Sequence, residues 1–178
     1  MVDISFSHDT LDFKLRNTGT DVSLLKRVEL VIKNKWLIQS EDPSKGFLLP
    51  SSQIYDISID SGIQVHETVS KILSEEIKGN DAEHFVLVIG SIQKQLLGNY
   101  IYCVGLKIFY NKDNSLTASS NVLFAFLNHE VIVSPVADSL VHARNLLKMA
   151  EISAIDGIRS EQLQNLINLF DKNQTSIK

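Results

Sequence analysis

The sequence has few of the features that mark secreted or membrane proteins. Its 178 residues include a single cysteine, Cys103, which cannot form a disulfide within the chain, whereas small secreted domains often carry cysteine pairs. The N-terminal sequence MVDIS lacks the basic and apolar segments of a secretory signal. No apolar run reaches the roughly 18 residues that a membrane span needs. These absences predict a cytoplasmic protein that does not cross a membrane.

Neither sign of charge dominates, because the net charge is −4 and charged residues make up 21% of the chain. Nucleic-acid binders usually show an excess of Lys and Arg. Basic residues cluster at Lys26, Arg27, Lys33 and Lys35, where Trp36 is the only neighbouring aromatic residue. Lysines on an edge strand discourage aggregation, which is a sufficient reason for this cluster. We therefore expect no nucleic-acid partner.

Sequence signatures of common catalytic and metal sites are missing too. The chain contains no G-x-S-x-G, P-loop, G-x-G-x-x-G or H-E-x-x-H motif. None of its five histidines has another ligand at a standard zinc spacing. Cys103 has no evident base beside it and is expected to be packed or interfacial. The sequence thus predicts a protein with no catalytic residues, no metal and no cofactor.

Alternation of apolar and polar residues with period two is the strongest pattern that the chain does contain. Leu11, Phe13 and Leu15 fall on one face of a predicted strand, and Tyr100 to Tyr110 alternate in the same way. Asn and Asp between 111 and 115 are typical of a hairpin turn. Strands are expected at about 11–16, 24–38 with a bulge near Asn34, 55–60, 63–69, 85–89, 100–110 and 116–127, with loops at 40–50 and 74–83.

About seven strands with turn signals between them favour a sandwich over a βαβ arrangement. No helical period occurs before Ser134. The expected fold is mainly β, an antiparallel immunoglobulin-like β-sandwich with a C-terminal two-helix tail. The sandwich domain is assigned to residues 1–130 and the helical tail to residues 131–178.

The tail is expected to hold two helices. The first is capped by Ser134 with Pro135 in its first turn, and it ends at Asp156-Gly157, where glycine serves as a left-handed terminator. Ser160 caps the second helix, whose apolar stripe is Leu163, Leu166, Ile167 and Phe170. The apolar stripe of the first helix is Val136, Leu140, Ala143, Leu147, Ala150 and Ala154.

The first helix carries more apolar residues than this one stripe. A helix lying on a sheet needs an apolar arc of only about 100°. The surplus must be covered by the second helix or by a partner subunit, and a homodimer through the tail is one such arrangement. The residues of this candidate interface are Ala137, Val141, Leu146, Met149, Ile152 and Ile155.

Stretches of the chain resemble bacterial immunoglobulin-like β-sandwich modules. In residues 11–19 (LDFKLRNTG) a strand ends in Asn-Thr-Gly, and a second hydrophobic strand follows at residues 24–28 (LLKRV). Residues 54–57 and 106–114 look like later strands of such a module. The resemblance covers residues 4–128. It implies a scaffolding or recognition role in larger assemblies and brings no catalytic residues with it.

Three functions remain open at this point. The leading one is a non-enzymatic protein-interaction module, which the missing catalytic motifs and the apolar helix favour. The second is a small-ligand or glycan binder that uses the loops at 40–50 and 74–83. The third is a hydrolase with dispersed carboxylates such as Asp56 and Asp60, which lie on one face of a predicted strand. A solvated sheet face would give the same alternation of polar residues.

Overall fold

The computed structural model of the chain describes residues 2–7, 10–39, 57–92, 99–112, 114–127 and 139–175. Strands dominate these residues, so the predicted mainly β class is confirmed. In chain order the elements are β1 (Val2–Ser7), β2 (Thr10–Arg16), β3 (Ser23–Ile38), β4 (Ile57–Asp60), β5 (Thr68–Ile77), β6 (Ala82–Ile92), β7 (Asn99–Tyr110), β8 (Asn114–Thr117), β9 (Asn121–Phe126), α1 (Ser139–Ala154), β10 (Gly157–Arg159) and α2 (Glu161–Thr175).

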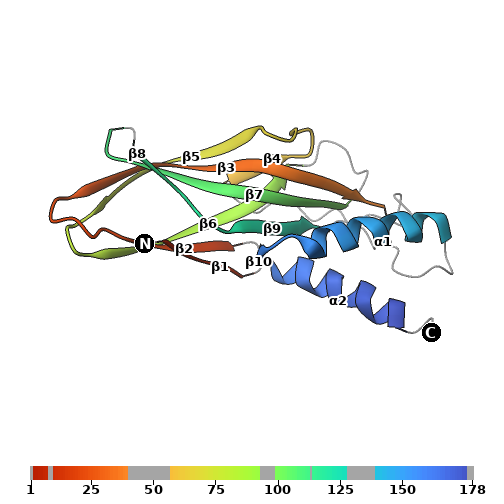
Figure 1. Cartoon of the computed structure of the whole chain (residues 1–178). Helices are drawn as coiled ribbons and strands as arrows, with labels where there is room; N and C mark the ends of the chain where they lie inside the picture. The colour runs from red at the N-terminus through yellow and green to blue at the C-terminus, as the bar shows by residue number, and fades with distance from the viewer. Residues whose placement is uncertain are drawn as a thin grey trace.

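The strands form two sheets (Figure 1). The smaller sheet has the order β1-β2-β6-β4. The larger has the order β10-β9-β7-β3-β5, with β8 beside the other half of β7. The predicted hairpin after β7 is confirmed, with Asn111 and Lys112 in its turn, and its partner strand is divided into β8 and β9.

The expectation that all strands are antiparallel is wrong at two sheet edges. β4 pairs in parallel with β6, and β10 pairs in parallel with β9. Parallel neighbours need a crossover between them. β5 provides the first crossover by way of the other sheet, and α1 provides the second. Because β10 is only three residues long, periodicity does not reveal this short strand–helix–strand unit.

The facing sides of the two sheets share one apolar core, which we call the inter-sheet core. Phe13 and Leu87 reach it from the smaller sheet, and Val28 and Leu106 reach it from the larger. The even-numbered face of β7 from Tyr102 to Ile108 is buried there, as the alternation predicts. Burial of this apolar surface is the main stabilising contribution to the arrangement.

β3 contributes to both faces of the larger sheet because of a bulge. Its pairing with β7 shifts register between Ile32 and Asn34, at the predicted position. Side chains alternate with period two, so one extra residue moves all later side chains to the opposite face. Ile32 therefore lies in the inter-sheet core, whereas Trp36 and Ile38 lie on the other face of the sheet.

The two helices cover this other face. Figure 1 shows them together at one end of the sheets. A second core, which we call the helix–sheet core, fills the space between them and the strands. No helix in the described ranges is both long enough and apolar enough to cross a membrane. The residues of the helix–sheet core are Trp36, Ile38, Ile101, Cys103, Leu123, Ala125, Met149, Ile152, Leu163, Leu166, Ile167 and Phe170.

The second helix matches its prediction and the first does not. Ser160 Oγ accepts a hydrogen bond from Leu163 N at 3.3 Å, and the predicted stripe of α2 is buried. In α1, by contrast, Leu140 and Leu147 of the predicted core stripe are exposed. The expected start at Ser134 lies outside the described residues. The assignment of α1's core face is therefore wrong.

Gly157 has a different role from the predicted left-handed terminator. It begins β10 opposite Asn121, and its φ lies outside the left-handed region. A Cβ atom there would stand 2.6 Å from the carbonyl oxygen of Asn121. Glycine thus permits the close approach of β10 to β9.

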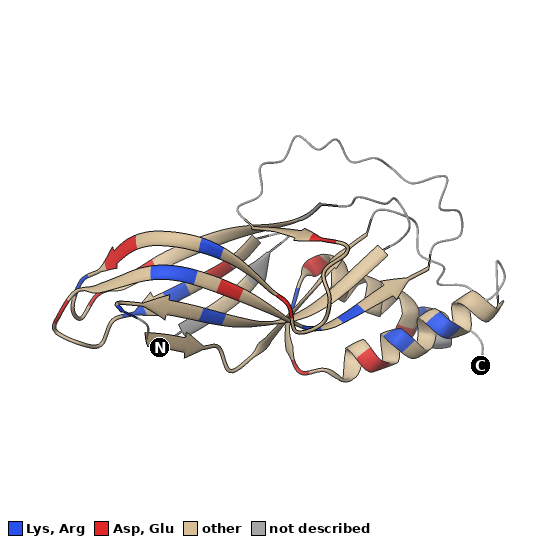
Figure 2. Ribbon diagram, turned by 90° about the horizontal axis from the view of Figure 1, so that it is seen from above, with Lys and Arg blue, Asp and Glu red and all other residues tan. Residues whose placement is uncertain are grey.

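The predicted loop at 74–83 is also wrong. β5 continues to Ile77 and β6 starts at Ala82, so the turn is confined to residues 78–81. The charged residues Glu75 and Glu76 are exposed on an edge strand, which tolerates them. Lys26 and Arg27 lie where β3 has both β5 and β7 as neighbours, so this part of the basic strand is not on an edge, whereas the pairing with β5 ends at Val31, before Lys33 and Lys35. Figure 2 shows charges of both signs along these long strands.

Two turns that cross between the sheets are bonded to each other. Asn17 follows β2, and its Nδ2 donates to the carbonyl oxygens of Asp21 at 2.7 Å and Ile77 at 3.0 Å. Asn80, with a φ of 61°, donates its N–H to Gly19 O at 2.9 Å. These bonds join the turn at 17–22 to the turn at 78–81, and thereby fix the two sheets at this end.

Gly79→Ala should lower the free energy of unfolding by about 1–3 kcal/mol, because overpacking forces the backbone to shift. A Cβ atom at Gly79 would lie 2.0 Å from the carbonyl oxygen of Thr20. Urea denaturation measures the change. Gly19→Ala is the control, since its Cβ would meet only the Asn17 side chain at 3.4 Å. Equal losses in the two variants would contradict the steric explanation.

Candidate functional site

The inner face of α1 is unusually polar for a helix face that packs on a sheet. Its buried residues are His142, Asn145, Met149 and Ile152. The His142 ring stacks on Phe170 of α2, with centroids 6.2 Å apart and planes at 15°. His and Asn are less often buried than Leu in globular proteins.

Asn145 attaches α1 to the end of β3. Its Oδ1 accepts from Gln39 N at 3.1 Å, and its Nδ2 donates to Gln39 O at 3.0 Å. About one helical turn after Asn145, Lys148 Nζ donates a hydrogen bond to Leu37 O at 2.6 Å. These bonds to the backbone fix the rotation of α1 about its own axis, and thus determine which residues face outward.

The outer face of α1 is apolar. We define it as Leu140, Ala143, Leu147, Ala150 and Ala154, all of which are exposed. Leu147, in the middle of the helix, is 72% exposed, and Leu140 is 60% exposed. Single exposed leucines are common, but a row of apolar residues at helical spacing is typical of an interaction surface.

The outer side of α2 contrasts with this face. Its exposed residues include Glu161, Gln162, Gln164, Asn168 and Lys172. Leu169, at 48%, is the only large apolar side chain among the exposed residues that are described on α2. α2 therefore has the ordinary distribution of a surface helix, and the apolar outer face is particular to α1.

The six residues of the candidate interface lie mostly on the side of α1 that faces the protein. Met149 and Ile152 are buried in the helix–sheet core, and Leu146 and Ile155 pack against it while half-buried. Val141 is half-buried, and Ala137 lies outside the described residues. Met149 and Ile152 are covered within the chain itself, and the exposed apolar surface of α1 consists of the residues assigned to the core stripe.

The size of the side chains is the signal that distinguishes the two faces. Half of the residues in the stripe predicted to be buried are alanines, whose small side chains fill little of the space between a helix and a sheet. Met149 and Ile152 remove more apolar surface from water when they are buried. Weighting each position by side-chain volume would have predicted the inner face, at the cost of burying His142 and Asn145.

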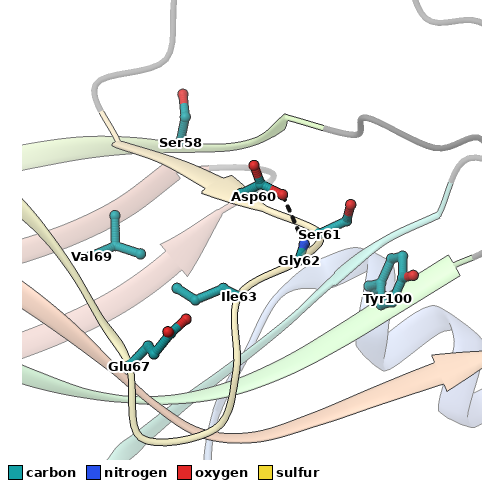
Figure 3. A pocket seen from close by; sticks show the side chains of 8 residues that line it. All are labelled: Ser58, Asp60, Ser61, Gly62, Ile63, Glu67, Val69 and Tyr100. Carbon is teal, nitrogen blue, oxygen red and sulfur yellow. Dashed lines mark hydrogen bonds between the residues drawn. The ribbon is translucent and has the colours of Figure 1, made fainter.

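A second candidate is a pocket of about 650 Å³ beside the β4–β5 turn (Figure 3). Asp60 is the last residue of β4, Glu67 lies on the turn that follows it, and Tyr100 lines the pocket from β7. Asp60 Oδ1 accepts from Gly62 N at 2.8 Å, and Glu67 Oε2 accepts from Gln64 N at 2.8 Å. The remaining lining residues are Ser58, Ser61, Gly62, Ile63 and Val69.

Lys35 of β3 lies beside this pocket and bonds to the backbone of the β4–β5 turn. Its Nζ donates to the carbonyl oxygens of Ser61 and Ile63, the latter at 3.1 Å, and lies 4.9 Å from the centroid of the Tyr100 ring. Burial lowers the pKa of Lys35, and the Asp60 carboxylate opposes that shift. The ammonium group holds the turn and partly balances the carboxylates. The pocket therefore offers acceptors and an aromatic face to a small polar ligand.

The sequence matches no protein-family model and no curated protein.

The pocket bears on the dispersed-carboxylate alternative only in part. Asp60 lies in it with Glu67, whereas Asp56 lies outside the described residues. Over the ranges that the structure describes, no group of three or more His, Cys, Asp and Glu side chains could hold a metal ion. His84 pairs with Asp12 across β6 and β2 at 2.5 Å, and both side chains are partly exposed. Neither residue lines the pocket. The pairing of Asp56 with Asp60 stays a prediction.

Cys103 is packed, as its position in the sequence predicts. It is 1% exposed in the helix–sheet core. Burial raises the pKa of its thiol, and Lys33 lowers it by a smaller amount. Both burial and a raised pKa reduce the accessible thiolate, which is the reactive form.

Alkylation of Cys103 by iodoacetamide at neutral pH should be at least about 10-fold slower in the folded protein than in urea-unfolded protein. Mass spectrometry of the modified fraction over time measures both rates. Because Cys103 is the only cysteine, the unfolded chain is its own control. Similar rates in the two states would show that the helices leave the sheet face open.

Proposed function

We propose that this chain is a non-enzymatic protein-interaction module that binds a protein partner through the outer face of α1. The observation that carries the proposal is that α1 exposes Leu147 at its centre while it buries His142 and Asn145. A helix that served only to cover the sheet would be more stable with its leucines buried and its polar residues exposed. The exposed leucines therefore serve an interaction outside the chain.

The energy of this arrangement supports the proposal. Burying a leucine side chain fully contributes about 1.5–3 kcal/mol, so Leu140 and Leu147 together can supply several kcal/mol to an interface. The backbone bonds of Asn145 and Lys148 already hold the helix in orientation. A preformed helix loses less conformational entropy on binding than a flexible segment does.

The resemblance to bacterial immunoglobulin-like modules agrees with this role, because it implies scaffolding or recognition. Asn17 and Gly19 of the Asn-Thr-Gly sequence connect the two sheets through the bonds to the neighbouring turn. These turns lie at the start of β3, whereas α1 contacts Leu37 and Gln39 at its other end, so the bonds fix the end of the sheets away from the helices (Figure 1). We propose that the module is immunoglobulin-like and acts in a bacterial cytoplasm.

A photo-crosslinking residue at position 147, introduced in the native host, tests the proposal. Irradiation should give protein adducts of discrete mass, because Leu147 lies at the centre of the proposed interface. The matched control is the same substitution at Leu169, which is 48% exposed on the polar side of α2. Absence of discrete adducts at position 147, or equal adducts at both positions, would count against the proposal.

Binding of a small polar ligand such as a sugar is the second candidate function. The observation in its favour is the pocket beside Tyr100, which an aromatic ring lines together with the two carboxylates Asp60 and Glu67. Its volume lies in the range of ligand sites. A thermal-shift series with sugars should raise the melting temperature, and Tyr100→Ala should remove the effect. If no sugar stabilises the protein at millimolar concentration, this candidate is rejected.

A further inference from the structure

The outer face of α1 has the spacing of a helix that pairs with another helix. Its residues follow one another at intervals of three, four, three and four, from Leu140 to Ala154. This is the spacing of coiled-coil contacts, in which side chains of one helix fit between those of its neighbour. The alanines leave room for close approach, at the lower end of the 8–10 Å range of interaxial distances.

The charges beside this face are arranged symmetrically about its centre. Arg144 and Glu151 are both exposed and lie seven residues apart on the same flank of the outer face. The midpoint between them falls at Leu147 and Lys148. Lys148 is bonded to Leu37 O on the side of β3 and so is directed away from the face.

We propose that the partner is a second copy of this chain, with its α1 antiparallel to the first about a two-fold axis near Leu147. This inference rests on the proposed function and identifies the occupant of the interaction surface. The argument for a second copy is charge complementarity. An antiparallel pair brings Arg144 to the height of the partner's Glu151 and Glu151 to the height of the partner's Arg144.

A parallel pair lacks this complementarity. Arg144 and Glu151 each directly follow a contact position, and a parallel pair places the two copies of this flank on opposite sides of the contact, where neither charge meets its counterpart on the partner. The apolar residues agree with the antiparallel choice. Leu140 lies opposite the partner's Ala154, a large side chain facing a small one, and the two copies of Leu147 meet at the axis.

Exchanging the two charges tests the arrangement in the full chain. Arg144→Glu and Glu151→Arg should each raise the dissociation constant of the dimer by about 10-fold or more, because each removes two attractive pairs and adds two repulsive ones. The double variant R144E/E151R restores both pairs in reverse and should return to within about threefold of the unchanged protein. Sedimentation equilibrium gives the constants. A double variant as weak as the single ones would overturn the antiparallel pairing.

A mixture of the two single variants is a second test. Each of them carries like charges along the flank, but together they are complementary. The mixture should therefore form a mixed dimer more tightly than either variant forms its own. In a parallel pair the variants would gain no such advantage, so equal association in all three samples contradicts the proposal.

Leu147→Cys places a thiol at the two-fold axis, and under oxidising conditions it should form an intermolecular disulfide. Leu169→Cys is the control, and it should form little or no intermolecular disulfide. Native Cys103 is buried and does not interfere. Circular dichroism and thermal melts establish that both variants fold, since both positions are exposed.

The outcomes separate the self-pairing from the broader function. The unchanged chain could stay monomeric at high micromolar concentration while photo-crosslinking at position 147 gives an adduct with a different protein. In that case the proposed self-pairing is wrong, and the proposed interaction function is supported. If neither dimer nor adduct forms, both proposals are wrong. A dimer whose charge variants behave as expected supports both.

Discussion

Phe170→Ala should lower the free energy of unfolding by about 3–5 kcal/mol, the usual cost of removing a buried aromatic ring. Phe170 is 1% exposed and lies in the helix–sheet core. Its ring also covers His142, so the substitution leaves a cavity beside a polar side chain. Urea or guanidinium denaturation followed by circular dichroism measures the loss.

Leu169→Ala is the matched control for this prediction, because it removes a similar side chain one position earlier on the polar side of α2. Leu169 is 48% exposed, and its loss should change the free energy of unfolding by less than about 1 kcal/mol. If Phe170→Ala costs no more than the control, the helices do not share a core with the sheet.

Asn145→Ala should cost about 2–4 kcal/mol, the second-largest effect that we expect. The substitution removes the partners of Gln39 N and Gln39 O, and each backbone group left unsatisfied costs about 1–3 kcal/mol. The loss also frees α1 to rotate about its axis. Denaturation gives the change in stability, and the amount of dimer gives the effect on the outer face.

Lys148→Ala is the control on the same helix. Lys148 makes one exposed bond, to Leu37 O, which contributes about 0.5–1.5 kcal/mol. A loss for Asn145→Ala no larger than that for Lys148→Ala would mean that the contact with Gln39 is unimportant. A dimer that withstands Asn145→Ala would mean that the orientation of α1 does not depend on this side chain.

Local patterns predicted most of the strands because their physical cause is local. Leu11, Phe13 and Leu15 are buried as their alternation indicates, and the bulge near Asn34 is visible where the pattern changes face. The parallel edges β4 and β10 could not be predicted in this way. Contacts between distant segments determine which strands are neighbours. A strand shows the same period-two alternation whether it pairs in parallel or antiparallel.

The inverted assignment of α1 has a different cause. Periodicity finds two apolar faces on this helix and cannot tell which one meets the sheet. The choice depends on partners that lie far away in the chain, such as Gln39 for Asn145 and Phe170 for His142. The pocket escaped prediction for a similar reason, because Tyr100 joins Glu67 and Asp60 only through the pairing of distant strands.

The order of synthesis gives the helix–sheet core a further consequence. Trp36, Ile101 and Leu123 form the apolar sheet face and leave the ribosome before α1 and α2 do. Segments fold as they emerge from the N-terminal end, and uncovered apolar surface favours aggregation. A nascent chain that ends near residue 130 would therefore expose an apolar, aggregation-prone sheet face. Only translation through Phe170 supplies the residues that cover this face.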